Sequence, residues 1–392
     1  MIRMLSVQVG AILLTLGAIA VVEKVFVSVP ASAELAAQSV QKSSLPSFRV
    51  DPYWPKPLPN DWLVGNVVGV AADSHDNIWI VQRPNSQQGA EKTPPAIEFD
   101  PAGKVLRTLG PPGDSRYEWG NQPHGIYVDY KDNVWVGFGG GLPYVPKEKS
   151  TYGNAHFLKF GPDGKFLLQI GVFGTGLEGS NSTKYLGQPT DVWVDPKTDE
   201  VYISDGYTNH RVVVFNANTG EYKRHWGAYG HKPDDGPLPK FDRNGPPRQQ
   251  FDTPHCIVGT NDGLLYVCDR GNQRIQVFKT DGTFVKEALI GAKLSDGTVA
   301  GAPWDIAVSR DPQQRYLFVV DGSTHRVYTV VRESLEVVDA FGRRGRWVGE
   351  FESPHSIAND SKGNLFVAET LDGRRIQKFN VQRTASRKNT AE

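Results

Sequence analysis

The 392-residue sequence carries no excess of either charge, because 43 lysines and arginines balance 43 aspartates and glutamates. Without a basic surplus there is no electrostatic argument for binding nucleic acid or another phosphate-rich partner. The signatures of two common reaction types are also missing. Gly139-Gly140-Gly141 is not followed by Gly-Lys-Ser/Thr, so it is not a phosphate loop, and there is no Gly-x-Ser-x-Gly elbow for a nucleophilic serine.

Long apolar runs are scarce, and the clearest one lies near the N-terminus. The run Val9–Val22 is too short to span a bilayer comfortably. It follows a positive start at Arg3 and precedes the small-residue motif Ala31-Ser32-Ala33. This order predicts an export signal over residues 1–33 and a linker over 34–47, with an uncleaved membrane anchor as the alternative. Under both interpretations we expect the folded part to be periplasmic or secreted, with membrane contact only if the N-terminal segment is retained.

Cysteine is almost absent, since Cys256 and Cys268 are the only two. They flank the turn at residues 260–263 symmetrically, so a hairpin centred there would place them opposite each other. An oxidising compartment would permit a disulfide between them. Strand-pair geometry often fits a disulfide poorly, so two free buried thiols remain an equal alternative.

The sequence is instead rich in turn formers, with 41 glycines and 27 prolines, and it contains a repeat. Each copy begins with a short apolar strand that ends in a polar residue. The six copies are Gly69-Val-Ala-Ala-Asp73, Gly125-Ile-Tyr-Val-Asp129, Asp191-Val-Trp-Val-Asp195, Cys256-Ile-Val-Gly-Thr260, Asp305-Ile-Ala-Val-Ser309 and Ser356-Ile-Ala-Asn-Asp360.

Three further strands follow in most copies, at a period of roughly 50 to 65 residues, which is typical of a β-propeller. We therefore predict an all-β fold, a six-bladed β-propeller over residues 48–380, with a C-terminal tail over 381–392. The last copy lacks a clear fourth strand. Residues 48–50 could supply it from the N-terminal end and close the ring, which would remove the exposed strand edges.

Loop lengths indicate which face of the propeller carries the function. The turns after the first and third strands are tight, whereas the loops after the second and fourth are long, as at residues 83–95, 139–152, 172–187 and 228–250. Long loops on one face of a rigid scaffold commonly build a binding site.

Three histidines occupy the same position in alternate copies, each after a proline: His124, His255 and His355. Thr190 and Trp304 hold that position in two of the copies between them. In a ring of six blades the three imidazoles would point at one central place, and three imidazoles with an open fourth position make a common catalytic zinc site. Copper, nickel or iron would also accept imidazole ligands. The alternative is that histidine is merely tolerated at this position.

Arg83, Tyr207 and Arg270 each follow the second strand of their copy, so we expect them on the long-loop face with the histidines. A tyrosine can act as a general base when a neighbouring guanidinium stabilises its phenolate form. Other polar residues recur at fixed repeat positions and are predicted to serve the scaffold. These are Arg211, Arg274, Arg326 and Arg375, together with Asp205, Asp269 and Asp321, which we expect to hold loop backbone donors.

The repeats resemble NHL repeats, and the whole predicted propeller resembles the peptidyl-α-hydroxyglycine α-amidating lyase family. The matching segments are Val67-Val-Gly-Val-Ala-Ala-Asp73, Pro123-His-Gly-Ile126, Gln188-Pro-Thr-Asp-Val192, Ser204-Asp-Gly-Tyr207, Phe251-Asp-Thr-Pro-His255 and Phe351-Glu-Ser-Pro-His355. That family cleaves a peptide ending in α-hydroxyglycine to a C-terminal amide and glyoxylate. The resemblance implies zinc binding by the three histidines, Tyr207 as the general base and Arg83 as its guanidinium neighbour. We add Arg270 as a candidate for holding the substrate carboxylate.

The sequence departs from the family pattern at its predicted channel. The family has an aspartate after the third histidine that helps to bind a structural calcium, and here that residue is Ser356. The backbone carbonyls of Val70 and Ile126 would remain as ligands. Because calcium affinity depends on ligand charge, the loss of one carboxylate makes a calcium site doubtful.

Three functions are compatible with these residues. The first is an exported, monomeric zinc lyase acting on a small-molecule or peptide substrate of the α-hydroxyglycine type. The second is a non-catalytic propeller that binds a protein, peptide or glycan. The third is a metal-dependent hydrolase on the same scaffold. Fold alone does not decide among them, because propellers serve many functions.

Overall fold

The computed structural model describes residues 45–110, 116–140, 155–172, 178–293 and 299–382, nearly all in one compact unit, Pro46–Glu392. The predicted export signal, most of the tail, and parts of the loops at 139–152 and 172–187 lie outside the described residues. Among the residues that are described, no helix is long and apolar enough to cross a membrane.

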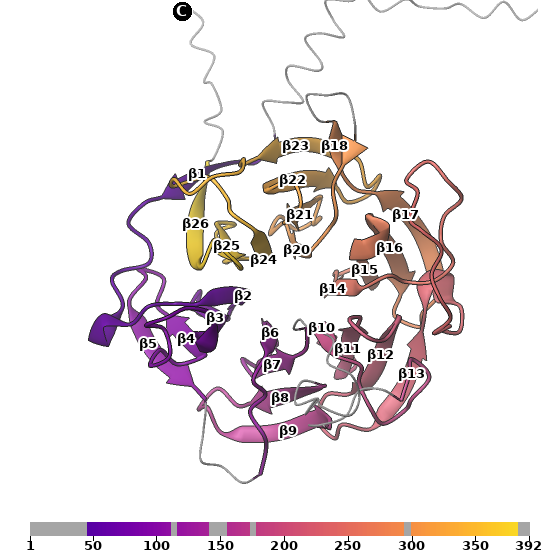
Figure 1. The fold of residues 1–392 in the computed structure, drawn as a ribbon, viewed down its shortest axis with the longest axis horizontal. Helices are drawn as coiled ribbons and strands as arrows, with labels where there is room; N and C mark the ends of the chain where they lie inside the picture. The colour runs from indigo at the N-terminus through magenta and orange to yellow at the C-terminus, as the bar shows by residue number, and fades with distance from the viewer. Residues whose placement is uncertain (1–44, 111–115, 141–154, 173–177, 294–298, 383–392) are drawn as a thin grey trace, which may run out of the picture. The chain divides into compact units, whose positions relative to one another are not determined.

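The described residues form six four-stranded antiparallel sheets, and the prediction of a six-bladed β-propeller is confirmed. Figure 1 looks down the ring, with the first strand of each blade nearest the centre. The first three blades contain β2 (Asn66–Ala72), β3 (Ile78–Arg83), β4 (Ala96–Phe99) and β5 (Val105–Leu109); β6 (Pro123–Val128), β7 (Val134–Phe138), β8 (His156–Phe160) and β9 (Phe166–Gly171); and β10 (Pro189–Val194), β11 (Glu200–Asp205), β12 (Arg211–Asn216) and β13 (Tyr222–Trp226).

The other three blades follow the same order, from the centre outward. They contain β14 (Pro254–Gly259), β15 (Leu264–Asp269), β16 (Arg274–Lys279) and β17 (Phe284–Leu289); β20 (Asp305–Val308), β21 (Tyr316–Asp321), β22 (Arg326–Val331) and β23 (Val337–Phe341); and β24 (Pro354–Asn359), β25 (Leu365–Glu369), β26 (Arg375–Gln382) and β1 (Ser47–Asp51). Smaller elements lie in the connecting loops: β18 (Ala292–Lys293), β19 (Val299–Ala300), η1 (Pro59–Asp61), η2 (Pro84–Ser86), η3 (Ala228–Gly230) and η4 (Arg270–Asn272).

The ring closes between the two ends of the described chain. Strand β1 pairs antiparallel with β26, in a register that runs from Ser47 opposite Gln382 to Asp51 opposite Lys378. Figure 1 shows the indigo β1 beside the yellow β26. The predicted closing strand is therefore confirmed, and blade six is completed by residues more than 300 positions away in sequence.

The core lies between neighbouring blades, because each sheet is covered on both faces. The second strands are almost wholly apolar for this reason, and Trp79 of β3 and Trp135 of β7 are at most 1% exposed. Trp79 packs among residues of blades one and two, and Trp135 among residues of blades two and three. Burial on both faces favours the continuous apolar runs seen in these strands over an alternating pattern.

Buried ion pairs lock the second strand of a blade to its third. Arg211 donates to Asp205 over 2.9 Å with both side chains fully buried, and Arg274 donates to Asp269 over 2.8 Å. Asp205 also accepts the backbone N–H of Gly187, as predicted for this repeat position. Arg326 differs: among the described residues it forms no ion pair, although it lies directly opposite the aspartate of its blade.

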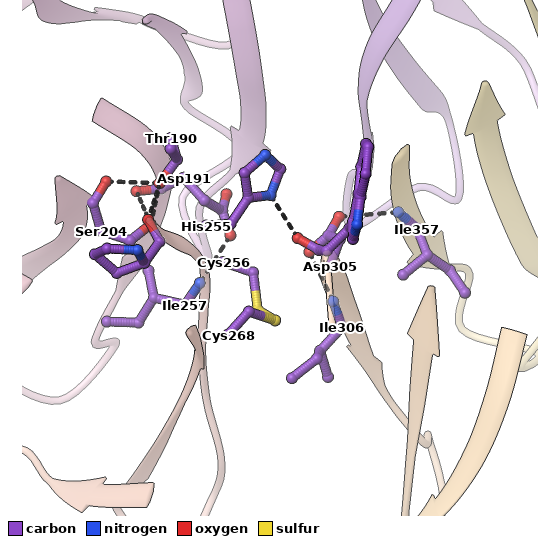
Figure 2. Close-up of a disulfide and its surroundings, with 12 residues drawn as sticks. Thr190, Asp191, Ser204, His255, Cys256, Ile257, Cys268, Asp305, Ile306 and Ile357 are labelled. Carbon is purple, nitrogen blue, oxygen red and sulfur yellow. Dashed lines mark hydrogen bonds between the residues drawn. A yellow bond between two sulfur atoms is a disulfide. The ribbon is translucent and has the colours of Figure 1, made fainter. Parts of the chain in front are cut away.

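The two cysteines are joined. Cys256 and Cys268 lie directly opposite each other on β14 and β15, with a Cα–Cα distance of 4.9 Å, and form a disulfide (Figure 2). The structure thereby selects one of the two alternatives that the sequence left open. The bridge immediately follows His255, so it ties the base of one predicted ligand to the next strand of its blade.

Candidate metal centre

The predicted ligands lie at irregularities in the innermost strands. In blades two, four and six the pairing register shifts at the histidine, between Pro123 and Ile126, between Pro254 and Cys256, and between Pro354 and Ser356. A β-bulge leaves the extra residue unpaired and redirects its side chain. The same shift occurs at Val68 in blade one and at Thr190 in blade three, so the bulge belongs to the repeat, and in alternate blades the residue at the bulge is a histidine.

The structure brings the three histidines together. A ring nitrogen from each of His124, His255 and His355 lies within 4.8 Å of those of the other two. The ring centroids are 4.9, 4.9 and 5.0 Å apart, so the triangle is almost equilateral. All three side chains are buried. This convergence is compatible with three ligands of one tetrahedral ion, whereas a merely tolerated histidine would need no such convergence.

Two of the three histidines are oriented by a carbonyl of the neighbouring blade. The Nδ1 of His124 lies 2.8 Å from the carbonyl oxygen of Thr190, and the Nδ1 of His255 lies 2.7 Å from that of Trp304. These partners occupy the histidine position of the next blade. The carbonyl of Val68 is the corresponding neighbour of His355 and raises its pKa, although the Nδ1 of His355 makes no full hydrogen bond. A carbonyl partner fixes the proton on Nδ1 and leaves the Nε2 lone pair for a metal.

The environment keeps the imidazoles uncharged. Burial is the main cause of the lowered pKa of all three, and it is reinforced by nearby positive charge. The pKa of His124 and of His255 falls well below 6.5, and that of His355 falls to about 3. Neutral imidazole is the form that binds metal. The donor set, its spacing and its protonation state thus fit zinc or another ion that prefers nitrogen ligands.

The hydroxyl of Tyr207 lies beside two of the three histidines. Its oxygen is 3.0 Å from Nε2 of His124 and 3.3 Å from Nε2 of His255. The backbone explains this position, because the N–H of Tyr207 donates to the carbonyl of Gln188, just before the first strand of the same blade. The N–H of Arg270 donates to Thr253 in the same way. Tyr207 and Arg270 are therefore equivalent residues of adjacent blades.

Two guanidinium groups flank the tyrosine. Nη1 of Arg270 donates to the hydroxyl of Tyr207 over 3.4 Å. Arg83 donates to the carbonyls of Pro123 and Gly140, and its guanidinium lies close enough to Tyr207 for the two groups to interact electrostatically. Burial lowers the pKa of Arg83 below its usual value. Among the described residues, neither arginine forms an ion pair with a carboxylate. The site therefore carries two uncompensated positive charges and is suited to an anionic ligand.

A channel continues from the histidines along the ring axis. It encloses about 370 Å³, and its lining includes Val70 and Ile126, the two residues predicted as backbone calcium ligands. The calcium site therefore stays a prediction from the sequence. The serine that replaces the expected aspartate, Ser356, donates its hydroxyl to Asp305 over 2.7 Å and accepts the N–H of Val70.

Sequence reasoning missed a pair of carboxylates in this channel, those of Asp191 and Asp305. They accept the backbone N–H groups of Ile257 and Ile357 on the following blades, over 3.0 and 2.9 Å (Figure 2). Both border the channel, yet protein surrounds them, and burial raises the pKa of each, that of Asp305 to about 6. Their shared repeat position, directly after the histidine position on blades three and five, is the signal that could have revealed them.

Comparison with known proteins supports the repeat assignment. Residues 186–215 and 251–278 match the model of the NHL repeat. A crystal structure of a structural genomics protein of unknown function from Bacteroides thetaiotaomicron superposes with a TM-score of 0.54 and 14% identity, covering 86% of this chain and 77% of that one. This likeness concerns the fold alone.

The sequence relatives include named amidating enzymes. The chain is 25% identical to peptidylglycine alpha-amidating monooxygenase of Rattus norvegicus, covering 79% of this chain and 30% of the rat protein. It is 27% identical to peptidyl-alpha-hydroxyglycine alpha-amidating lyase 1 of Drosophila melanogaster, covering 83% and 58%. It is also 26% identical to NHL repeat-containing protein 3 of Mus musculus, covering 85% and 84%.

The chain spans about a third of the length of the vertebrate monooxygenases that it matches, at 30%, 31% and 33% of three of them. The NHL repeats, the six blades and the relatives named as amidating lyases confirm the resemblance to that lyase family.

Proposed function

We propose that this protein is a metal-dependent lyase that cleaves an α-hydroxyglycine-type carbinolamide to an amide and glyoxylate. The observation that carries the proposal is the convergence of three uncharged imidazoles, with ring nitrogens within 4.8 Å of one another. Beside them lie a tyrosine and two arginines, which have no acidic partner among the described residues. Relatives named as amidating lyases support the reaction class.

The residues divide the chemistry as follows. A zinc ion held by the three imidazoles supplies Lewis acidity that lowers the pKa of a hydroxyl group beside it. Arg270 binds the substrate carboxylate through paired N–H donors. Tyr207, which lies beside the guanidinium groups of Arg83 and Arg270, acts as the general base that takes the proton of the carbinol hydroxyl.

Bond breaking then balances without water or a redox partner. The oxygen lone pair left by the proton forms the aldehyde C=O bond, and the C–N bond breaks with its electron pair on nitrogen. That nitrogen takes the proton from Tyr207 and becomes the primary amide, while the two-carbon fragment leaves as glyoxylate. The buried position of the histidines limits the entry of competing water.

Export is part of the proposal. The N-terminal apolar run and the small-residue motif predict it, and the Cys256–Cys268 disulfide supports it because such bonds persist in oxidising compartments. We propose a monomeric protein acting on a small-molecule or peptide substrate in the periplasm or outside the cell.

The test combines metal analysis with turnover. Purified protein should hold about one zinc or similar ion per chain and release glyoxylate from N-benzoyl-α-hydroxyglycine. The His255→Ala variant should lose both the ion and the turnover, whereas a matched surface variant, His231→Ala, should keep both. Unchanged turnover in His255→Ala would contradict the proposal.

A second function is favoured by one of the relatives. NHL repeat-containing protein 3 aligns over 84% of its length, more than the alignment covers of the lyase, and its name states no enzymatic activity. A non-catalytic propeller would hold a protein, peptide or glycan on the long-loop face. Partner binding that survives complete removal of metal by a chelator, in a protein that releases no glyoxylate, would favour this function.

A further inference from the structure

We propose that Trp304 is a positioning residue that holds the guanidinium of Arg270 in the orientation needed to bind the substrate carboxylate. The inference rests on the proposed function and specifies how that site selects an anionic substrate. Trp304 would touch Arg270 rather than the reacting atoms, so its effect is expected on carboxylate recognition and not on the chemical step.

The first observation concerns Arg270, whose guanidinium lies between two aromatic rings. Its central carbon is 5.3 Å from the ring centre of Tyr207 and 4.9 Å from that of Trp304. These distances fall within the range of cation–π attraction. Among the residues that the structure describes, its guanidinium makes one hydrogen bond, to the Tyr207 hydroxyl, which is long at 3.4 Å. Most of its five N–H donors therefore have no partner in the described part of the chain and are available for a ligand.

The second observation concerns the rigidity of Trp304. Its backbone is fixed at both polar atoms, because its N–H donates to Val320 over 2.9 Å and its carbonyl lies 2.7 Å from Nδ1 of His255. Its ring meets that of His355 edge to face, with centroids 5.5 Å apart. A side chain on Gly322 would approach the indole to 2.8 Å, so this glycine makes room for the ring.

Together these contacts restrain a side chain that would otherwise be mobile. A free arginine side chain loses about 2 kcal/mol of rotamer entropy when it is immobilised. Trp304 and Tyr207 impose much of that restraint before the ligand arrives. Planar, paired recognition of a carboxylate depends on the orientation of the guanidinium fork, so a preset fork raises affinity for a carboxylate and leaves affinity for an uncharged analogue unchanged.

The indole N–H has a separate and useful property. Nε1 of Trp304 is buried and has no hydrogen-bond partner in the described part of the chain. Phenylalanine therefore keeps an aromatic face at this position without breaking a hydrogen bond. Leucine keeps apolar volume but removes the π face. The pair Trp304→Phe and Trp304→Leu thus separates stacking on Arg270 from simple packing.

The experiment compares two substrates, N-benzoyl-α-hydroxyglycine and its methyl ester, which lacks the carboxylate charge. Trp304→Leu should raise KM for the acid about tenfold, the range expected for a lost cation–π contact, and leave kcat and the ester's KM within about twofold. Trp304→Phe should retain most of the preference for the acid. Combining Trp304→Leu with Arg270→Gln should add nothing to Arg270→Gln alone. Equal losses for acid and ester, or additive effects in the double variant, would overturn the proposal.

A binding measurement keeps this proposal distinct from the proposed function. Glyoxylate carries the carboxylate that Arg270 would hold, and its affinity can be measured by calorimetry without turnover. Wild-type protein and Trp304→Phe should bind it, and Trp304→Leu should bind about tenfold more weakly with unchanged metal content. If the wild-type protein cleaves neither the acid to glyoxylate nor the ester to methyl glyoxylate, the proposed function fails. The order of these affinities still decides the role of Trp304, and equal affinities in all three proteins would refute it.

Discussion

Gly206→Ala should disable the site while leaving the propeller folded. A Cβ at this position would lie 2.0 Å from the carbonyl oxygen of Pro254, whereas ordinary contact begins at 3.4 Å, so the two backbones must separate by about 1.4 Å. Gly206 immediately precedes Tyr207, and Pro254 immediately precedes His255. The separation therefore moves the phenol away from the imidazole that it now meets at 3.3 Å.

Two magnitudes follow from this displacement. Overpacking of this kind costs about 1–3 kcal/mol of folding free energy, which urea denaturation would measure. A misplacement of about 1 Å at a reacting group lowers turnover on the order of 100-fold, which glyoxylate release would measure. The metal content should not change, because the histidines are oriented by other contacts.

The matched control is Gly236→Ala. This glycine also has an ordinary backbone conformation, but its nearest neighbour is the exposed side chain of Asp234, which can move. We expect it to change stability by less than about 0.5 kcal/mol and turnover by less than about twofold. Full turnover in Gly206→Ala, with a stability loss of the expected size, would refute the idea that this close approach positions Tyr207.

Three other predictions concern the scaffold. Arg211→Gln leaves a fully buried carboxylate uncompensated and should lower the free energy of unfolding by about 3–5 kcal/mol. Arg326 holds the same repeat position but forms no ion pair among the described residues, so Arg326→Gln should cost less than about 1 kcal/mol. Similar losses for the two variants in urea titrations would contradict a stabilising role for the Arg211–Asp205 ion pair. Burial lowers the pKa of His156 from 6.5 to about 4, so the unfolded chain binds the proton first as pH falls, and stability should drop by up to about 3 kcal/mol between pH 6.5 and 4. His156→Phe should remove that part of the slope, and an unchanged slope would show that another group causes it. Replacing Cys256 and Cys268 by alanine should cost up to about 3 kcal/mol from loop entropy, and reductant should destabilise the wild type but not the double variant.

The fold and the ligand triangle could be predicted because both follow from the repeat. The strands are short, apolar and regularly spaced. Residues 48–50 pair with the last blade, which would otherwise leave the edge of its third strand unpaired. His124, His255 and His355 share one repeat position, so ring symmetry alone places them around a common axis. Residue identity and position were sufficient for these conclusions.

Contacts between different blades could not be predicted in this way. The carbonyls that orient the histidines belong to the backbone, so Thr190 and Trp304 fulfil this role whatever their side chains are. The stacking of Arg270 on Trp304 joins side chains of two blades whose separation no sequence pattern encodes. The carboxylates of Asp191 and Asp305 hold backbone N–H groups of the following blades, and this role too depends on contacts between blades that the repeat pattern does not specify.

The disulfide was predictable in part: the sequence pattern gives the pairing of the two cysteines but not whether they bond. Symmetry about the turn was sufficient to place Cys256 opposite Cys268 in the hairpin. Whether the thiols could bond depended on the local separation and direction of two Cβ atoms, which strand twist determines and which the sequence pattern does not specify.

The hydrogen bonds from histidine rings to carbonyls of the next blade have a consequence for the order of folding and metal binding. The rings of His124 and His255 are held by carbonyls of the adjoining sheet, and the sheet that carries His355 is completed only when the first described strand joins the last. A chain whose ring has not yet closed therefore lacks the arrangement of imidazoles seen in the closed propeller. Under the proposed function, an ion would bind with full affinity only after closure, so a partly folded intermediate would compete poorly with the finished protein for scarce metal.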